Sequence, residues 1–219
     1  MFSSAAPSPA ELISAKAAAR SAAQAAVRSI PKDSRAELSA AAAARVASLP
    51  EWISARTVGL FVSLPSEPGT DLLLAIARAA GKTTLLPRVR GPLATDLALL
   101  AVRADEDVRS FPRASFVGGG IPQPDETYTD GSMREALTPD LILVPGAAFD
   151  ANGGRLGQGK GYYDAWFAAH SGVSDSAMCR VGYAFDEAIF EAGAAVPTGP
   201  DDARVHIVVT PTRTIFCER

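Results

Sequence analysis

Residues 141–164 constrain the fold of this chain more than any other segment, because a short apolar run leads directly into a glycine-rich turn. The run at 141–144 is continuously hydrophobic, as strands buried in a parallel sheet tend to be. Glycines crowd residues 153–161, where they permit positive φ and let a ligand approach the backbone closely. A strand, a glycine turn and a following helix predict an α/β fold with an anion site.

The rest of the chain alternates between helical and strand patterns. Helices are expected over 11–29, from a Ser34-x-x-Glu37 capping box to about residue 48, from a Thr70 cap to Gly81, and over 161–170. Strands are expected over 57–63, 83–86, 96–103, 141–144, 178–184 and 205–210, with an irregular region over 105–139. This alternation predicts a three-layer α/β/α fold with a mostly parallel central sheet and helices on both faces.

Composition narrows the classes of protein. The chain has 219 residues and a net charge of −3, so one domain over residues 10–219 is expected, with no basic field for nucleic acid. No apolar run is long enough for a membrane span. The two cysteines lack metal spacing, which favours a reducing, cytoplasmic compartment, and we expect a monomer. Residues 1–9 are expected to be disordered; the acid-poor start also resembles a transit peptide, but a helix is favoured.

The glycine turn fits neither common phosphate-binding motif. Gly154 through Lys160 matches G-x-x-x-x-G-K, but Gly161 stands where a P-loop has Ser or Thr. The even spacing of Gly157, Gly159 and Gly161 departs from the dinucleotide-binding fingerprint.

The chemistry of a phosphate site nevertheless remains in this turn. Arg155 and Lys160 can balance phosphate charge, and Asp164 can replace the missing hydroxyl as an oxygen ligand for Mg²⁺. A flexible surface turn is the alternative, but two tyrosines and a carboxylate directly behind the loop favour a functional site.

The stretch V-P-G-x-x-F-D-x-x-G-x-R-L-G-x-G-K-G-Y-Y-D at 144–164 resembles the signature of the 5-formyltetrahydrofolate cyclo-ligase family. Weaker matches extend over 61–70, 81–88, 121–124 and 196–210. The resemblance implies an enzyme that uses ATP and Mg²⁺ to convert the small molecule 5-formyltetrahydrofolate to 5,10-methenyltetrahydrofolate, with release of ADP and phosphate.

The resemblance also implies roles for individual residues. It assigns catalysis to Lys160, Arg155 and Asp164, and Mg²⁺ binding to Asp164 and Asp202. It assigns ATP contacts to Lys16, Arg20, Arg155, Leu156, Gly157, Gln158, Gly159, Lys160, Gly161, Tyr162 and Tyr163. It assigns substrate contacts to Val62, Glu67, Gln158, Gly159, Lys160, Gly161 and Tyr162.

The residues alone favour plainer interpretations for several of these positions. Lys16 and Arg20 share one helix face, which is ordinarily solvated. Glu67 is an acid in a loop, and Asp202 lies beside another acid in a Pro/Gly-rich turn. Each of these would face solvent if the resemblance were set aside.

Three departures from the family pattern leave other functions open. Gln158 replaces an arginine, Gly119 a tryptophan and His206 an aspartate. They motivate a non-catalytic folate- or nucleotide-binding paralogue as an alternative, and a third hypothesis is an α/β enzyme acting on sugar phosphates or acyl-CoA. Arg88 and Arg90 either pair with nearby acids or meet anionic substrate groups.

Overall fold

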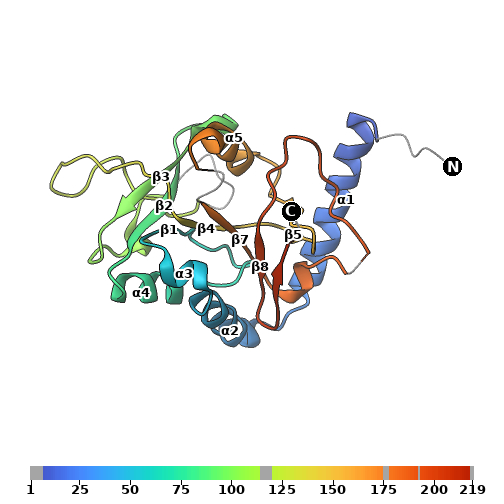
Figure 1. Ribbon diagram of the computed structural model, residues 1–219, viewed down its shortest axis with the longest axis horizontal. Helices are drawn as coiled ribbons and strands as arrows, with labels where there is room; N and C mark the ends of the chain where they lie inside the picture. Colours follow the sequence, from blue (N-terminus) through green and yellow to red (C-terminus); the bar gives the residue numbers. More distant parts are fainter. Residues whose placement is uncertain (1–6, 114–119, 175–177, 192, 218–219) are drawn as a thin grey trace.

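The computed structural model describes residues 7–113, 120–174, 178–191 and 193–217 (Figure 1). Its largest feature is a seven-stranded sheet in the order β3-β2-β1-β4-β7-β8-β9, with a separate two-stranded sheet of β5 and β6. The strands are β1 (Thr57–Gly59), β2 (Thr83–Val89), β3 (Leu97–Val102), β4 (Leu141–Val144), β5 (Ala148–Phe149), β6 (Arg155–Leu156), β7 (Cys179–Tyr183), β8 (Ile207–Val209) and β9 (Thr214–Phe216).

The core of the sheet is parallel and its two edges are antiparallel. Strands β2, β1, β4, β7 and β8 run in the same direction, whereas β3 and β9 run against their neighbours. The helices are α1 (Pro9–Arg28), α2 (Arg35–Ala47), α3 (Pro50–Ser54), α4 (Asp71–Ala79) and α5 (Tyr162–Ser174).

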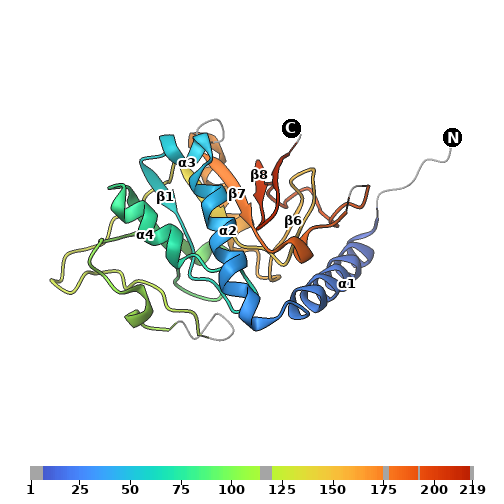
Figure 2. The same ribbon diagram turned by 90° about the horizontal axis from the view of Figure 1, so that it is seen from below.

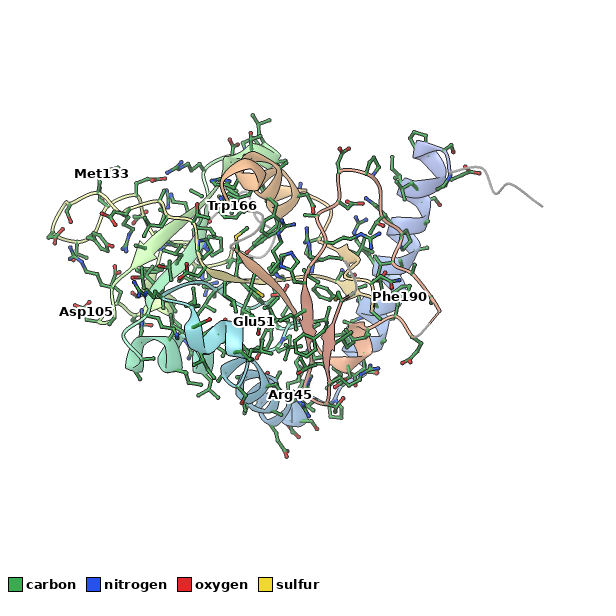
Figure 3. The ribbon with its side chains drawn as sticks, viewed as in Figure 1. Arg45, Glu51, Asp105, Met133, Trp166 and Phe190 are labelled. Atoms are coloured by element: carbon green, nitrogen blue, oxygen red, sulfur yellow. The ribbon has the colours of Figure 1, made fainter. Side chains whose placement is uncertain are left out.

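Helices cover both faces of the sheet, so the predicted three-layer α/β/α fold is confirmed (Figure 1). Alternating side chains of β4 show why: Leu141 and Leu143 pack with α2, α3 and α4, whereas Ile142 and Val144 pack with α5. A strand that is buried on both faces needs a continuous apolar sequence, which is what residues 141–144 have. Trp166, labelled in Figure 3, anchors α5 to its face of the sheet.

Helix α1 lies beside the sheet rather than across it, as Figure 2 shows. Its buried alanines, Ala19 and Ala23, pack in a small cluster with Ala148 and Leu156 of the β5–β6 pair. Phe190 packs against the same cluster (Figure 3). Small side chains let the helix approach this pair closely, and α1 therefore borders the loop that follows β6.

The start of α1 corrects one prediction. Ser8 caps the helix, because its hydroxyl accepts from the Glu11 amide at 3.4 Å while the Glu11 carboxylate accepts from the Ser8 amide at 2.8 Å. Helix α1 thus begins at Pro9 with Ser8 as its cap, so the predicted disorder over residues 1–9 does not hold for these two residues. Residues 1–6 lie outside the described residues.

Two predicted helix caps are also wrong. Ser34 belongs to a 3₁₀ turn (Lys32–Ser34) with αR backbone, so its side chain does not cap α2. Thr70 does not cap α4 either, because its hydroxyl donates to the Phe61 carbonyl at 2.5 Å. That bond instead ties the end of β1 to the start of α4.

Strand β2 is longer than predicted, since it continues through Pro87 to Val89. Parallel pairing with β1 ends at Leu85, whereas pairing with β3 extends to Val89. A proline is tolerated where one neighbouring strand has already ended. The predictions also missed α3 and β9, which are only five and three residues long.

The described part of the irregular region is held by stacked charged and aromatic side chains. The Tyr128 ring lies between the guanidinium groups of Arg103, at 3.8 Å, and Arg134, at 4.1 Å. Arg134 also forms a buried ion pair with Glu106. These contacts fix the segment against β3 without regular secondary structure. No described helix combines the length and hydrophobicity that a membrane crossing requires.

Candidate active site

A cavity of about 330 Å³ opens at the carboxyl ends of the central parallel strands. Strand β1 has β2 on one side and β4 on the other, so the connections after β1 and β4 diverge there. Such a topological switch point is where open α/β sheets bind ligands. The cavity is lined after β1 by Phe61, Val62, Leu64 and Glu67, after β4 by Pro145, and by the glycine turn.

Asp150 shapes the start of the glycine turn. Its buried carboxylate accepts hydrogen bonds from the amides of Asn152 (2.9 Å), Gly154 (2.8 Å) and Val196 (2.7 Å). A Cβ at Gly153, where φ is +79°, would lie 2.3 Å from the Val205 carbonyl oxygen, so this position requires glycine. The turn is therefore rigidly built at its base, which argues against a flexible surface loop.

The rest of the turn runs directly into α5. Gly159 and Gly161 have φ values of +94° and +72°, and α5 begins at Tyr162. Positive φ at these two positions is a conformation that side chains disfavour. The turn consequently presents backbone beside the amino-terminal end of a helix, an arrangement that attracts anions.

Helix α1 faces this turn with the polar stripe that the sequence predicts. Arg20 Nε donates to the Gly157 carbonyl at 2.8 Å, and the Gln24 amide donates to Gln158 Oε1 at 3.2 Å. Lys16 forms an ion pair with Asp202. The plain interpretation of Lys16 and Arg20 as a solvated face is therefore wrong, because the packing of α1 turns both toward the cavity.

Two acids of the site, Asp164 and Asp202, are each paired with a cation. Arg155 Nη2 donates to Asp164 Oδ1 at 2.5 Å, and the Ala203 amide donates to the same oxygen at 3.1 Å. Asp202 Oδ2 accepts from Lys16 and from the Gly199 amide at 2.5 Å. The 199–203 turn thus holds both carboxylates at one side of the cavity.

These two carboxylates fit a magnesium site. Described Asp, Glu, His and Cys side chains do not gather here in threes. Mg²⁺ commonly takes only one or two protein carboxylates and completes its shell with water and substrate phosphates. Asp164 and Asp202, beside a turn whose backbone and cations suit a phosphate, supply that number.

Glu67 also lines the cavity, in a turn that its own carboxylate closes. Glu67 Oε2 accepts from the Leu64 amide at 2.8 Å, while the Glu67 amide donates to the Leu64 carbonyl at 2.9 Å. Removal from water raises the pKa of Glu67 to about 7, although the Leu64 hydrogen bond opposes the shift. The expectation of a solvent-facing acid is wrong, since this carboxyl lies in the cavity wall.

The two adjacent tyrosines, Tyr162 and Tyr163, have different surroundings. Tyr162 donates its hydroxyl to the Gly91 carbonyl at 3.2 Å, which joins the β2–β3 loop to the glycine turn. The buried hydroxyl of Tyr163 has no hydrogen-bond partner among the described residues. Burial, and then the nearby Glu67 charge, raise the pKa of Tyr163. A buried polar atom in a cavity wall that lacks a partner points to a ligand.

The cavity collects every residue that the sequence selected for the site. Its lining includes Lys16, Arg20, Val62, Glu67, Arg155, Leu156, Gly157, Gln158, Gly159, Lys160, Gly161, Tyr162, Tyr163, Asp164 and Asp202. These residues come from α1, the turn after β1, the glycine turn, α5 and the turn before β8.

Arg88 and Arg90 do not reach the cavity as phosphate ligands. Both side chains bond to Glu126, at 3.1 Å and 2.8 Å respectively, and Arg88 also bonds to the Pro124 carbonyl at 2.7 Å. Of the two possibilities for these arginines, pairing with nearby acids is the one observed.

Sequence reasoning missed three residues that shape the site. Asp150 organises the glycine turn, and its place just before the glycines is the signal that could have found it. Gln123 is buried beside the cavity and bonds to both the amide and the carbonyl of Val89, at 3.0 Å each. Phe61 lines this cavity and a neighbouring one of about 430 Å³. Both residues lie in segments that weakly match the family, 61–70 and 121–124, and that match is the signal that could have found them.

The three departures from the family pattern have different outcomes. Gln158 remains in the cavity wall and bonds to Gln24. His206 Nδ1 accepts from the Arg180 amide at 3.1 Å, so this residue serves the sheet rather than the site. Gly119 lies outside the described residues.

Comparison with known proteins identifies the family of this chain. The 5-formyltetrahydrofolate cyclo-ligase family matches residues 12–211. A 5-formyltetrahydrofolate cyclo-ligase of Mycolicibacterium smegmatis is 32% identical over 168 residues, or 76% of this chain and 79% of that protein. A probable 5-formyltetrahydrofolate cyclo-ligase of Caenorhabditis elegans is 29% identical over 169 residues, or 76% and 78% of the two chains.

A solved structure has the same fold. The 5,10-methenyltetrahydrofolate synthetase of Aquifex aeolicus aligns with a TM-score of 0.71 at 25% identity, covering 93% of each chain. The family match spans most of the chain and includes the whole glycine turn. From its sequence, its fold and the geometry of its cavity, this chain belongs to the 5-formyltetrahydrofolate cyclo-ligase family.

Proposed function

We propose that this protein converts 5-formyltetrahydrofolate to 5,10-methenyltetrahydrofolate, using ATP and Mg²⁺ and releasing ADP and phosphate. The observation that carries the proposal is the shared cavity. It joins a cationic glycine turn and helix face to an apolar wall that holds one partly buried carboxyl, Glu67. One end suits a polyphosphate, and the other suits a pterin whose ring N–H groups need acceptors.

The reaction needs an activated oxygen on the formyl group. The formyl oxygen attacks the γ-phosphorus, the bond to ADP breaks, and the formyl carbon becomes an imidate that bears phosphate. N10 of the folate then attacks that carbon and loses its proton, and phosphate leaves with the former formyl oxygen. Such a phosphoryl transfer depends on in-line positioning and charge neutralisation more than on a strong base.

The chain's own residues supply those two requirements. Lys160 and Arg155 stand beside the glycine turn to balance charge on the transferring group, while Lys16 and Arg20 hold the polyphosphate from α1. Asp164 and Asp202 would hold Mg²⁺, which neutralises phosphate charge when bound. Val62 and Glu67 would orient the pterin, with the Glu67 carboxyl accepting from its N–H groups.

The direct test is a spectroscopic assay of the wild-type protein. Incubation with 5-formyltetrahydrofolate, ATP and Mg²⁺ should generate the methenyl chromophore in step with ADP. ATP binding without product would contradict the proposal and favour the non-catalytic paralogue. Product without ATP consumption would favour an unrelated chemistry.

Variants test the assignment of charge in the site. Lys160→Ala and Asp164→Asn should each lower kcat by about 10²-fold or more, because the transition state loses an electrostatic partner. Lys82→Ala is a matched control: its ammonium bonds to the Ala55 carbonyl at 2.5 Å, outside the cavity lining. Near-normal kcat in both site variants would refute these roles.

We also propose that the enzyme acts as a monomer in the cytoplasm. A single chain provides every group assigned above to ATP, folate and Mg²⁺, so the reaction does not need a second copy. Cys179 and Cys217 are thiols, as is usual in a reducing compartment.

A further inference from the structure

Arg35, the first residue of α2, bridges two parts of the site without touching the cavity. Its Nη2 donates to the Val27 carbonyl at 2.7 Å, and Nε and Nη2 both approach the Ile30 carbonyl at 3.4 Å. Its Nη1 donates to the Pro65 carbonyl. One guanidinium group thus bonds to the end of α1 and to the turn that carries Glu67.

The acceptors on both sides are neutral backbone carbonyls. Val27 lies in the last turn of α1, where carbonyls lack partners within the helix and a cation is favoured by the helix dipole. Pro65 lies within the turn that the Glu67 carboxylate closes onto the Leu64 amide. The bonds of Arg35 therefore fix where that turn sits relative to the helix.

Arg35 joins α1 to the Glu67 turn where the two do not pack closely against each other. A small cavity separates α1 from the turn, with Gln24 and Val27 on the helix side and Ser66, Glu67 and Pro68 on the turn side. The far end of the turn is tied to α2 instead, where the Gly69 amide donates to Ser39 Oγ at 2.9 Å.

We propose that Arg35 is a positioning residue that couples the nucleotide side of the site to its folate side. The inference rests on the proposed function. Nucleotide bound by Lys16 and Arg20 fixes α1, and Arg35 transmits that position to the Glu67 turn. Each ligand then raises the affinity for the other, because coupling between two sites is reciprocal.

The experiment measures this coupling directly. The Kd of 5-formyltetrahydrofolate is measured by calorimetry with and without a saturating non-hydrolysable β,γ-imido analogue of ATP and Mg²⁺. In the wild type the analogue should tighten folate binding by about 5-fold or more, as couplings of this kind do. In Arg35→Met the ratio of the two Kd values should fall to about 1, because the bridge to Pro65 is lost.

Arg45→Met is the matched control. Arg45 lies on the same helix at the lower edge of Figure 3, and its Nε donates to the Pro211 carbonyl at 2.9 Å. It therefore makes the same kind of bond, to a proline carbonyl, away from the cavity. Its variant should keep the wild-type coupling ratio even if it lowers stability.

A second variant and a second measurement keep the test decisive. Arg35→Lys keeps the charge but cannot span both acceptors, so it should fold and still lose the coupling. In the wild type, the analogue alone should slow hydrogen exchange at the amides of Leu64 and Glu67.

Three outcomes would overturn the inference: no coupling in the wild type, full coupling in a folded Arg35 variant, or unchanged exchange in the turn. Failure of the wild type to form the methenyl product is a separate result, which would contradict the proposed function instead.

Discussion

The position of Glu67 affects both its place in the cavity and its protonation. The same removal from water that comes with its place in the cavity wall raises its pKa from 4.5 to about 7. Between these pH values the folded protein holds a proton that the unfolded chain has lost. The free energy of unfolding therefore falls as pH rises from about 4.5 to about 7, and this contribution is constant above that range.

Glu67→Gln should remove this pH dependence while keeping the acceptor for the Leu64 amide. Relative to the wild type, the variant should be more stable at pH 8 than at pH 5 by about 2 kcal/mol. Denaturant unfolding of both proteins at the two pH values measures the difference. An equal stability difference at both values would show that Glu67 titrates normally.

Tyr163→Phe separates binding from stability at a single atom. The Tyr163 hydroxyl is buried without a described partner, so its removal should leave the unfolding free energy unchanged or raise it by about 1 kcal/mol. If the hydroxyl forms a hydrogen bond to the substrate, the KM for 5-formyltetrahydrofolate should rise in the same variant. A loss of stability with unchanged KM would instead assign the hydroxyl a structural role.

At the scale of elements, the alanines of α1 decide how near its cations come to the glycine turn. Ala19 and Ala23 pack against the β5–β6 pair, and Arg20 reaches the glycine turn, and Lys16 reaches Asp202, only because the helix lies that close. The role of α1 cannot be inferred from its charged residues alone, because its small buried side chains set the position of those charges.

Ala23→Leu should push α1 away from the turn. Overpacking should lower the unfolding free energy by about 1–3 kcal/mol. The same substitution should raise the KM for ATP, because Lys16 and Arg20 move with the helix. Ala22→Leu, on the exposed side of α1, is the control and should change neither quantity appreciably. Unchanged KM for ATP in a destabilised Ala23→Leu protein would show that the helix position does not matter for nucleotide binding.

Across the whole molecule, the site joins segments that are far apart in the chain and whose charges already neutralise one another. Lys16 pairs with Asp202, and Arg155 pairs with Asp164. ATP alone must compete with these carboxylates for the cations. Mg²⁺ together with ATP offers each acid a cation and each base a phosphate.

Nucleotide should therefore stabilise the protein strongly only together with the metal. Saturating ATP with excess Mg²⁺, at about 100 times its Kd, should add about 2.7 kcal/mol to stability and raise Tm by roughly 5–10 °C. The same ATP with EDTA should give a clearly smaller shift, and Mg²⁺ alone almost none. Equal shifts with and without the metal would contradict a role for Asp164 and Asp202 in metal binding.

The sequence anticipated the parts of this protein that have local causes. A continuous apolar run predicted the buried strand β4. The crowded glycines predicted the turn before α5, and several of them have positive φ in the structure. Caps were less predictable: the Thr70 hydroxyl bonds to Phe61, a partner nine residues away that a local pattern cannot reveal. The contacts of the irregular region could not be predicted from local patterns either, because Tyr128 is held by arginines from two different segments.

What the sequence determined by itself is the chemistry and the class of fold: which loop is suited to an anion, which residues carry charge, and that strands alternate with helices. Only the tertiary structure decided the environment of each group. It turned a helix face toward the loop, placed Glu67 partly buried in the cavity wall, paired Asp164 and Asp202 with bases and left the Tyr163 hydroxyl without a partner among the described residues. The physical reason is that backbone preference and hydrophobic period act between near neighbours, whereas burial and ion pairing depend on which distant segments pack together.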